Sequence, residues 1–118
     1  MQLEEKAVSL RIFIGENDRF GDHPLYEAIV LKAREQELAG ATVLRGPMGF
    51  GRSSRLHTAT ILRLSEDLPI VVEIIDSEQK IMAFLPLVDE MMQGGLISLS
   101  EVRILRYEPD GKGSALGS

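Results

Sequence analysis

Hydrophobic side chains change their spacing along this chain in a fixed order, and this order limits the possible folds more than any other feature. From Val8 to Ile14, apolar side chains occupy every second position, which indicates a β-strand with one buried face. From Pro24 onward they recur with helical spacing, which indicates an amphipathic helix of about four turns that ends at Gly40. Residues 41–45 are then a second strand candidate.

The second half of the chain repeats this change from strand spacing to helix spacing. Residues 59–64 alternate weakly, as a strand arm or an ordered loop would. The apolar, β-branched run 70–75 indicates a central strand that is covered on its faces. Glu73 interrupts this run, and we expect it to face a neighbouring subunit, to pair with an arginine or to lie on an exposed sheet face.

A second amphipathic helix is expected after this strand. Asp76 is the predicted N-cap, and Gly94 and Gly95 end the pattern. Pro86 lies inside the helix, where we expect a kink because proline removes one backbone hydrogen bond. One face of the helix carries its apolar side chains: Ile81, Phe84, Leu85, Val88 and Met91.

A last strand over residues 96–99 and 102–107, with an irregularity expected near Ser100, completes the order strand, helix, strand, strand, helix, strand. This order predicts an α+β, ferredoxin-like βαββαβ fold, an antiparallel sheet with two helices on one face. The other face would be uncovered and would favour association between copies, with Phe13 and Leu105 as the expected apolar contacts. The chain is expected to form one domain over residues 1–107, followed by a disordered, Gly/Ser-rich tail over 108–118.

Composition excludes several classes of function. The 118 residues include 18 acidic and 13 basic side chains, and a net charge of −5 argues against non-specific nucleic-acid binding. The absence of cysteine excludes disulfides, thiolate nucleophiles and Cys-ligated metals. No apolar run approaches the roughly 20 residues that a membrane span needs, so no membrane insertion is expected. Glu4 and Glu5 precede any apolar stretch, unlike a signal peptide, and we therefore predict a cytoplasmic protein.

The segment 46–55 is the strongest candidate for ligand binding. Its glycines permit positive φ angles and a close approach by a ligand, and its arginines offer fork-shaped donors that suit phosphate. The spacing matches neither a Walker P-loop nor a dinucleotide-binding fingerprint. A glycine-rich hairpin with solvated arginines explains the same residues without a ligand.

Candidates for catalysis and metal binding are fewer. Ser53 and Ser54 lie near His57, but no orienting acid marks a catalytic triad, so we predict that the protein is not an enzyme. His23 and His57 each lack a second histidine at metal-ligand spacing. His57 remains the one candidate metal ligand, and no metal site is assigned.

Several ordered blocks resemble a family of small uncharacterised prokaryotic proteins that is grouped with the nitrogen-regulatory PII-like signalling proteins. The resemblance runs from about Val8 to Tyr107. The blocks are residues 15–18, 24–29, 39–46, 49–51, 68–73 and 75–76. The resemblance implies a PII-like, ferredoxin-like fold that assembles as a homotrimer. It also implies clefts between subunits that bind small ligands, often adenine nucleotides. The long loop after the second strand would contact a partner, frequently a membrane transporter or an enzyme.

The resemblance also places ligand contacts. Residues 49–52 are similar to the Gly-Phe-Gly-Arg that opens the PII loop, Arg103 matches a basic position of the last strand, and Arg106 is a looser match. Gly94-Gly95 lacks the lysine of the PII phosphate loop, and Tyr26 and Tyr107 lie outside the loop, so neither ATP specificity nor uridylylation is implied. Together with the glycine-rich segment, the predicted ligand-binding residues are Gly46, Gly49, Phe50, Gly51, Arg52, Arg55, Arg103 and Arg106.

Three functional hypotheses follow. The leading one is a regulatory module that binds a small anionic ligand, with an adenine nucleotide as the candidate cofactor, between subunits and signals through loop 52–58. The second is a metal-binding trimer similar to divalent-cation tolerance proteins, with His57 and acids of a neighbouring chain as ligands. The third is an enzyme that acts on a phosphorylated small substrate in the same cleft.

Overall fold

A computed structural model of the chain describes residues 6–49, 57–58 and 67–108. The predicted tail therefore lies outside the described residues except for Glu108, and so does the strand candidate 59–64. The described elements, in chain order, are β1 (Ala7–Gly15), β2 (Arg19–Phe20), β3 (His23–Pro24), α1 (Leu25–Glu35), β4 (Thr42–Arg45), β5 (Met48–Gly49), β6 (His57–Thr58), β7 (Pro69–Ser77), α2 (Glu78–Met91) and β8 (Leu96–Val102).

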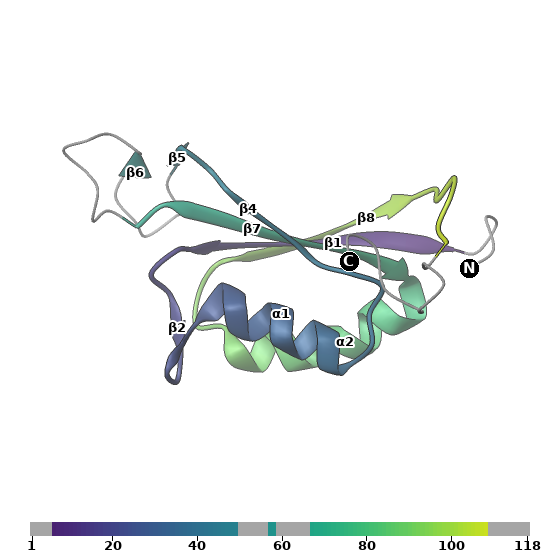
Figure 1. Cartoon of the computed structure of the whole chain (residues 1–118), viewed down its shortest axis with the longest axis horizontal. Coiled ribbons are helices and arrows are strands. Elements are labelled where there is room, and N and C mark those ends of the chain that lie inside the picture. The colour runs from purple at the N-terminus through teal and green to yellow at the C-terminus, as the bar shows by residue number, and fades with distance from the viewer. Residues whose placement is uncertain (1–5, 50–56, 59–66, 109–118) are drawn as a thin grey trace.

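Four strands form one antiparallel sheet in the order β4-β7-β1-β8. Both helices lie on one side of this sheet, and the other side carries no helix among the described residues (Figure 1). Strand β7 lies beside β4, the preceding strand of this sheet in sequence, and β1 lies between β7 and β8. This arrangement confirms the predicted α+β, ferredoxin-like fold. The pairs β2–β3 and β5–β6 add two short hairpins.

The hydrophobic core lies between the sheet and the helices. Alternate residues of β1 and β7 face inward, and Leu10, Ile12 and Ile74 are completely buried. Their partners across the layer include Ile29 of α1 and Phe84 of α2. The strand spacing of two and the helical spacing of three to four therefore place the same kinds of aliphatic side chains on facing surfaces.

Helix α1 ends at Glu35, five residues before the expected end at Gly40. Glu37 adopts a φ of 61°, a left-handed conformation that cannot continue the helix. Beyond it, the backbone N–H of Ala39 donates to Asp76 at 2.8 Å. The linker between α1 and β4 is therefore held by a residue that is distant in sequence.

Two further boundaries differ from the sequence predictions. The N-cap of α2 is Ser77, whose hydroxyl accepts a hydrogen bond from the N–H of Lys80, and Asp76 holds the linker instead. Pro86 lies within one continuous helix. Strand β8 runs through Ser100 without a break and ends at Val102, because Val102 pairs with Ala7, the first residue of β1. Residues 103–107 thus have no strand partner and leave the sheet.

Neither described helix has the length and apolar character that a membrane crossing would require.

Candidate functional site

The glycine-rich segment begins at the end of the sheet where β4 leaves it. The N–H of Gly46 donates to the carbonyl of Pro69 at 2.8 Å. A Cβ atom on Gly46 would lie 2.9 Å from Cγ of Pro69, and one on Gly49 would lie 3.1 Å from the same atom. Neither glycine has the positive φ that the sequence suggested. Close packing against Pro69 thus accounts for the missing side chains at both positions.

The other predicted ligand-binding residues of segment 46–55 are not described by the structure. Phe50, Gly51, Arg52 and Arg55 lie outside the described residues. The backbone of His57 forms β6 and pairs with Gly49.

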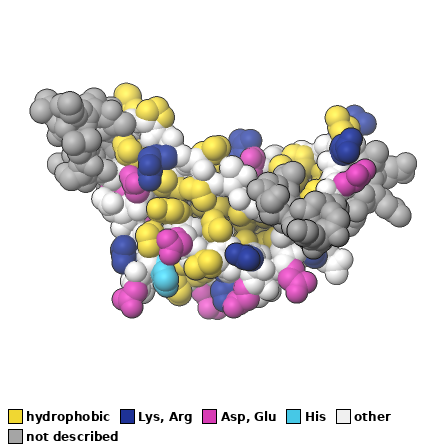
Figure 2. All heavy atoms as spheres, in the orientation of Figure 1, with side chains coloured by type: hydrophobic (Ala, Val, Ile, Leu, Met, Phe, Trp, Pro, Cys, Tyr) yellow, Lys and Arg dark blue, Asp and Glu magenta, His cyan; other side chains and the backbone are white. Residues whose placement is uncertain are grey.

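Arg103 and Arg106 lie at the opposite end of the sheet. Arg103 follows Val102, which pairs with Ala7, whereas Gly46 follows Arg45, whose partner in β7 pairs with Ile14. The seven steps from Ala7 to Ile14 span about 24 Å at about 3.4 Å per residue. Figure 1 shows the β5–β6 hairpin at one end and the segment directly after β8 at the other, and Figure 2 shows Lys or Arg side chains at both ends. A single chain therefore separates the two halves of the predicted ligand site.

A cavity of about 230 Å³ lies at the end that carries Arg106. One wall is the α1–β4 linker and the start of β4, residues 39–42, and the floor is formed by Glu73 and Ile75 of β7. Ile104, Arg106 and Tyr107 form the remaining wall. Of the predicted ligand-binding residues that the structure describes, Arg106 alone lines this cavity.

The position of the cavity follows from the sheet order. Strands β4 and β8 lie at opposite edges of the sheet. The segment after Val102 must therefore cross β1 to reach the linker and β7. Glu73 and Ile75 alternate with the inward-facing residues Val72 and Ile74, so the segment crosses the sheet on the face that the helices leave open.

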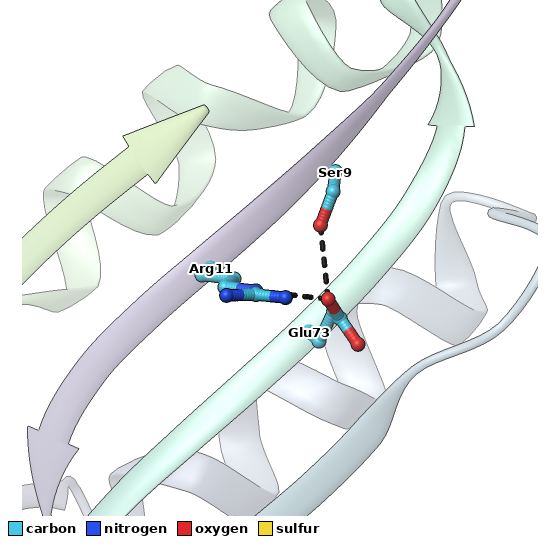
Figure 3. A network of polar contacts seen from close by, with 3 residues as sticks. All are labelled: Ser9, Arg11 and Glu73. Atoms are coloured by element: carbon cyan, nitrogen blue, oxygen red, sulfur yellow. Dashed lines mark hydrogen bonds and ion pairs between the residues drawn. The ribbon is translucent and has the colours of Figure 1, made fainter. Parts of the chain in front are cut away.

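A polar network lies in the middle of this open face. Oε2 of Glu73 accepts hydrogen bonds from Nε of Arg11 at 2.9 Å and from the hydroxyl of Ser9 at 3.0 Å (Figure 3). Arg11 is directly opposite Glu73 in the β1–β7 register, and Thr42 is opposite it in the β4–β7 register. This geometry confirms two of the expectations for Glu73: it pairs with an arginine, and it lies on the open face.

Asp76 holds the rim of the cavity. Its carboxylate accepts hydrogen bonds from the N–H of Ala39 at 2.8 Å and from the N–H of Ser77 at 2.6 Å. Nζ of Lys80 donates to the carbonyl of Glu37 at 3.1 Å. The end of β7 and the first turn of α2 therefore fix the linker that forms one wall.

The open face also carries a row of apolar side chains across all four strands. Strand register places Leu44, Val71, Phe13 and Leu96 side by side, and we call these four residues the apolar row. Leu44 is 53% exposed and Leu96 is 58% exposed. Leu105, the other expected apolar contact, lies in the segment after β8 and is 76% exposed.

Metal ligands do not cluster in the part of the chain that the structure describes. No group of three His, Asp or Glu side chains there could hold a metal ion. His23 of β3 contacts Glu27 in the first turn of α1, at 3.1 Å between Nδ1 and Oε1.

Sequence reasoning missed most of the cavity. Glu73 carried a signal, because a charged residue inside an apolar run needs a partner or a function. The α1–β4 linker and Tyr107 carried no such signal, since they come close to each other only because of the path that the chain takes after β8.

Comparison with solved structures supports the fold. CPII, a nitrogen regulatory PII-like protein from Thiomonas intermedia K12, bound to ADP and bicarbonate, has a TM-score of 0.61 at 14% identity. The match covers 86% of this chain and 90% of that chain. CutA1 from Oryza sativa has a TM-score of 0.54 at 14% identity and covers 99% of this chain and 100% of that chain.

Comparison of sequences identifies relatives of nearly the same length. A UPF0166 protein from Aquifex aeolicus (strain VF5) is 39% identical over 103 residues, which cover 85% of this chain and 94% of that protein. UPF0166 protein MJ1524 from Methanocaldococcus jannaschii is 32% identical over 104 residues, which cover 87% of this chain and 95% of that protein. Residues 7–104 match the family described as "DUF190: Uncharacterized ACR, COG1993", and the chain belongs to this family of uncharacterised proteins with a PII-like fold.

Proposed function

We propose that this protein is a homotrimeric PII-like regulatory module that binds a small anionic ligand, an adenine nucleotide, in clefts between its subunits. The observation that carries the proposal is the cavity beside Arg106, which combines apolar walls with a cationic side chain. Pockets for small ligands have this character, with mostly apolar walls and a few polar groups that fix orientation.

The size of the cavity defines which part of a ligand it would hold. Its volume of about 230 Å³ is below the roughly 300–1,000 Å³ of pockets that enclose a whole drug-sized ligand. A single ring system fits this space, and the rest of a nucleotide would extend out of it. The side chain of Arg106 is 81% exposed and its Nη2 lies 3.7 Å from Oε2 of the similarly exposed Glu108, so it can turn to meet a phosphate outside the cavity. The ADP in the structure of CPII supports this choice of ligand.

Association of subunits explains why the predicted site is divided. The glycine end and the arginine end of one chain lie about 24 Å apart along the strands. In a trimer, the glycine end of one subunit would approach the arginine end of the next. The apolar row would be buried between them, because Leu44 and Leu96 expose apolar surface that favours contact with another copy.

Signalling would depend on a change in the conformation of a loop, and no covalent bond would be made or broken. Ligand bound between subunits would favour one conformation of loop 52–58, since a ligand shifts an equilibrium toward the state that it binds more tightly. That conformation would be recognised by a target protein, a membrane transporter or an enzyme.

The experiment combines mass measurement with calorimetry on the full chain. Light scattering is expected to give the mass of three chains, and titration with ATP, ADP, AMP and cyclic AMP is expected to reveal saturable binding. Arg106→Ala is expected to weaken that binding. Lys32→Ala on α1 is the matched control, because it removes one positive charge from a side chain that does not line the cavity. An intact trimer that binds none of these nucleotides would refute the nucleotide proposal.

The same preparation distinguishes the other two hypotheses. A stoichiometric metal that disappears in His57→Ala would favour the metal-binding trimer. Turnover of a phosphorylated substrate that disappears in Arg52→Ala would favour the enzyme.

A further inference from the structure

Glu73 is the one acidic side chain among the described residues that line the cavity. Its side chain is 25% exposed and lies on the cavity floor beside Ile75, with which it shares the open face of β7. A carboxylate can only accept hydrogen bonds. The floor of the cavity thus offers an acceptor to whatever enters it.

Two donors on the neighbouring strand β1 hold the carboxylate of Glu73 in one orientation. Nε of Arg11 and the hydroxyl of Ser9 both donate to the same oxygen, Oε2, at 2.9 and 3.0 Å. Figure 3 shows that the other oxygen points away from both donors. Strand register places Arg11 directly opposite Glu73, so this orientation is built into the sheet. The charge of Arg11 also offsets the cost of a carboxylate in this setting.

The surroundings define the chemical group that the second oxygen would accept from. Ile75 and Ile104 supply apolar surface, and the ring of Tyr107 supplies a flat aromatic surface. Planar heteroaromatic rings stack on such side chains. A ring that carries an amino group can donate to Glu73 from that group, whereas its oxo counterpart places an acceptor there and carries its hydrogen on the adjacent ring nitrogen.

We propose that Glu73 makes this cavity selective for an amino-bearing heteroaromatic ring, such as the base of an adenine nucleotide, over its oxo counterpart. Arg11 acts as a positioning residue, because it orients Glu73 without lining the cavity itself. This selectivity rests on the proposed function, and the amino group on the ring is the feature of the ligand that Glu73 would recognise.

The test compares two ligands that differ at this edge of the ring. ADP carries an amino group at C6 and no hydrogen on N1, whereas inosine diphosphate carries an oxygen at C6 and a hydrogen on N1. Calorimetric titration of the full chain is expected to show tighter binding of ADP by about 10- to 100-fold, the effect of one hydrogen bond to a charged group. Both ligands carry the same phosphates, so the ratio of their affinities isolates the ring.

Two substitutions are expected to change this ratio. In Glu73→Gln the side-chain amide can donate as well as accept, so the preference for ADP should fall to within a few-fold of unity. In Arg11→Met the carboxylate loses its fixed orientation, and the ratio should fall while the oligomer is retained. Ser98→Ala is the matched control, because Ser98 is opposite Arg11 on the other side of β1 and does not line the cavity.

The outcomes separate this inference from the proposed function. Equal binding of the two nucleotides by the unsubstituted protein would overturn the inference and leave the proposed function standing. A preference for ADP that survives in both Glu73→Gln and Arg11→Met would also overturn it. Absence of binding by either nucleotide would overturn both. If Glu73→Gln fails to assemble, the ratio measured on Arg11→Met decides.

Discussion

Substitution of Asp76 tests how the rim of the cavity is held. Asp76 is 4% exposed, and its carboxylate joins the α1–β4 linker to the end of β7 across 37 positions of the sequence. Asp76→Asn keeps the size of the side chain but leaves one acceptor oxygen for two backbone donors. One of the N–H groups of Ala39 and Ser77 would then face an amide NH₂ group.

The magnitude follows from the two hydrogen bonds. A hydrogen bond to a charged group contributes about 1.5–3 kcal/mol to stability. Asp76→Asn is therefore expected to lower the free energy of unfolding by about 1.5–3 kcal/mol, and Asp76→Ala by about 3–6 kcal/mol. Since a domain of this size has a stability of about 5–15 kcal/mol, the alanine variant would lose a large part of it.

Urea denaturation followed by circular dichroism gives these free energies. Ser77→Ala is the matched control. It removes the N-cap of α2, the Ser77 hydroxyl that accepts a hydrogen bond from the backbone N–H of Lys80 at 3.3 Å. Loss of an N-cap costs about 1 kcal/mol, so the expected order of destabilisation is Asp76→Ala, Asp76→Asn and then Ser77→Ala. A larger effect of Ser77→Ala than of Asp76→Asn would refute the argument that Asp76 clamps the linker.

Two further predictions concern a glycine and an ion pair. Gly95→Ala should lower the free energy of unfolding by about 1–3 kcal/mol, because Gly95 has a φ of 107° and a Cβ would lie 2.7 Å from the carbonyl oxygen of Phe13. Gly94→Ala, whose Cβ would meet no atom within 4 Å, should change it by less than about 0.5 kcal/mol, and equal effects in denaturation would contradict the steric argument. Lys32 lowers the pKa of Glu35 by donating a hydrogen bond at 2.8 Å and by its charge. This lowered pKa contributes stability above the ordinary pKa of glutamate that is lost as pH falls through the lowered value. Lys32→Met should raise the Glu35 pKa in an NMR titration, and an unchanged value would show that Lys32 is not the cause.

Features that depend on local spacing could be predicted from the sequence. The alternation in β1 buries Leu10 and Ile12, and the helical stripe of α2 buries Phe84 and Val88. These patterns show directly which side chains share one face of a strand or helix. The order of the elements then restricts the fold to few arrangements, and the ferredoxin-like arrangement is the observed one.

Features that depend on distant partners could not be predicted in the same way. The linker after α1 is held by Asp76, and the end of β8 is determined by the position where β1 begins. Neither partner is visible in the local pattern. The same reasoning explains why Arg106 was found as a candidate, from a resemblance, while Glu73 was found only as an anomaly in a strand.

The cavity belongs to the connections of the fold more than to its strands. Its walls are the linker after α1 and the segment after β8, which meet over the open face at one end of the sheet. Within the sheet, β7 contributes Glu73, and this charge is tolerated because Arg11 lies opposite it in register. Connecting segments accept sequence change more readily than a packed sheet does. The walls of the cavity could therefore change through the two connections while the Arg11–Glu73 pair and the core remain unchanged, which makes that pair the part of the cavity most closely tied to the fold.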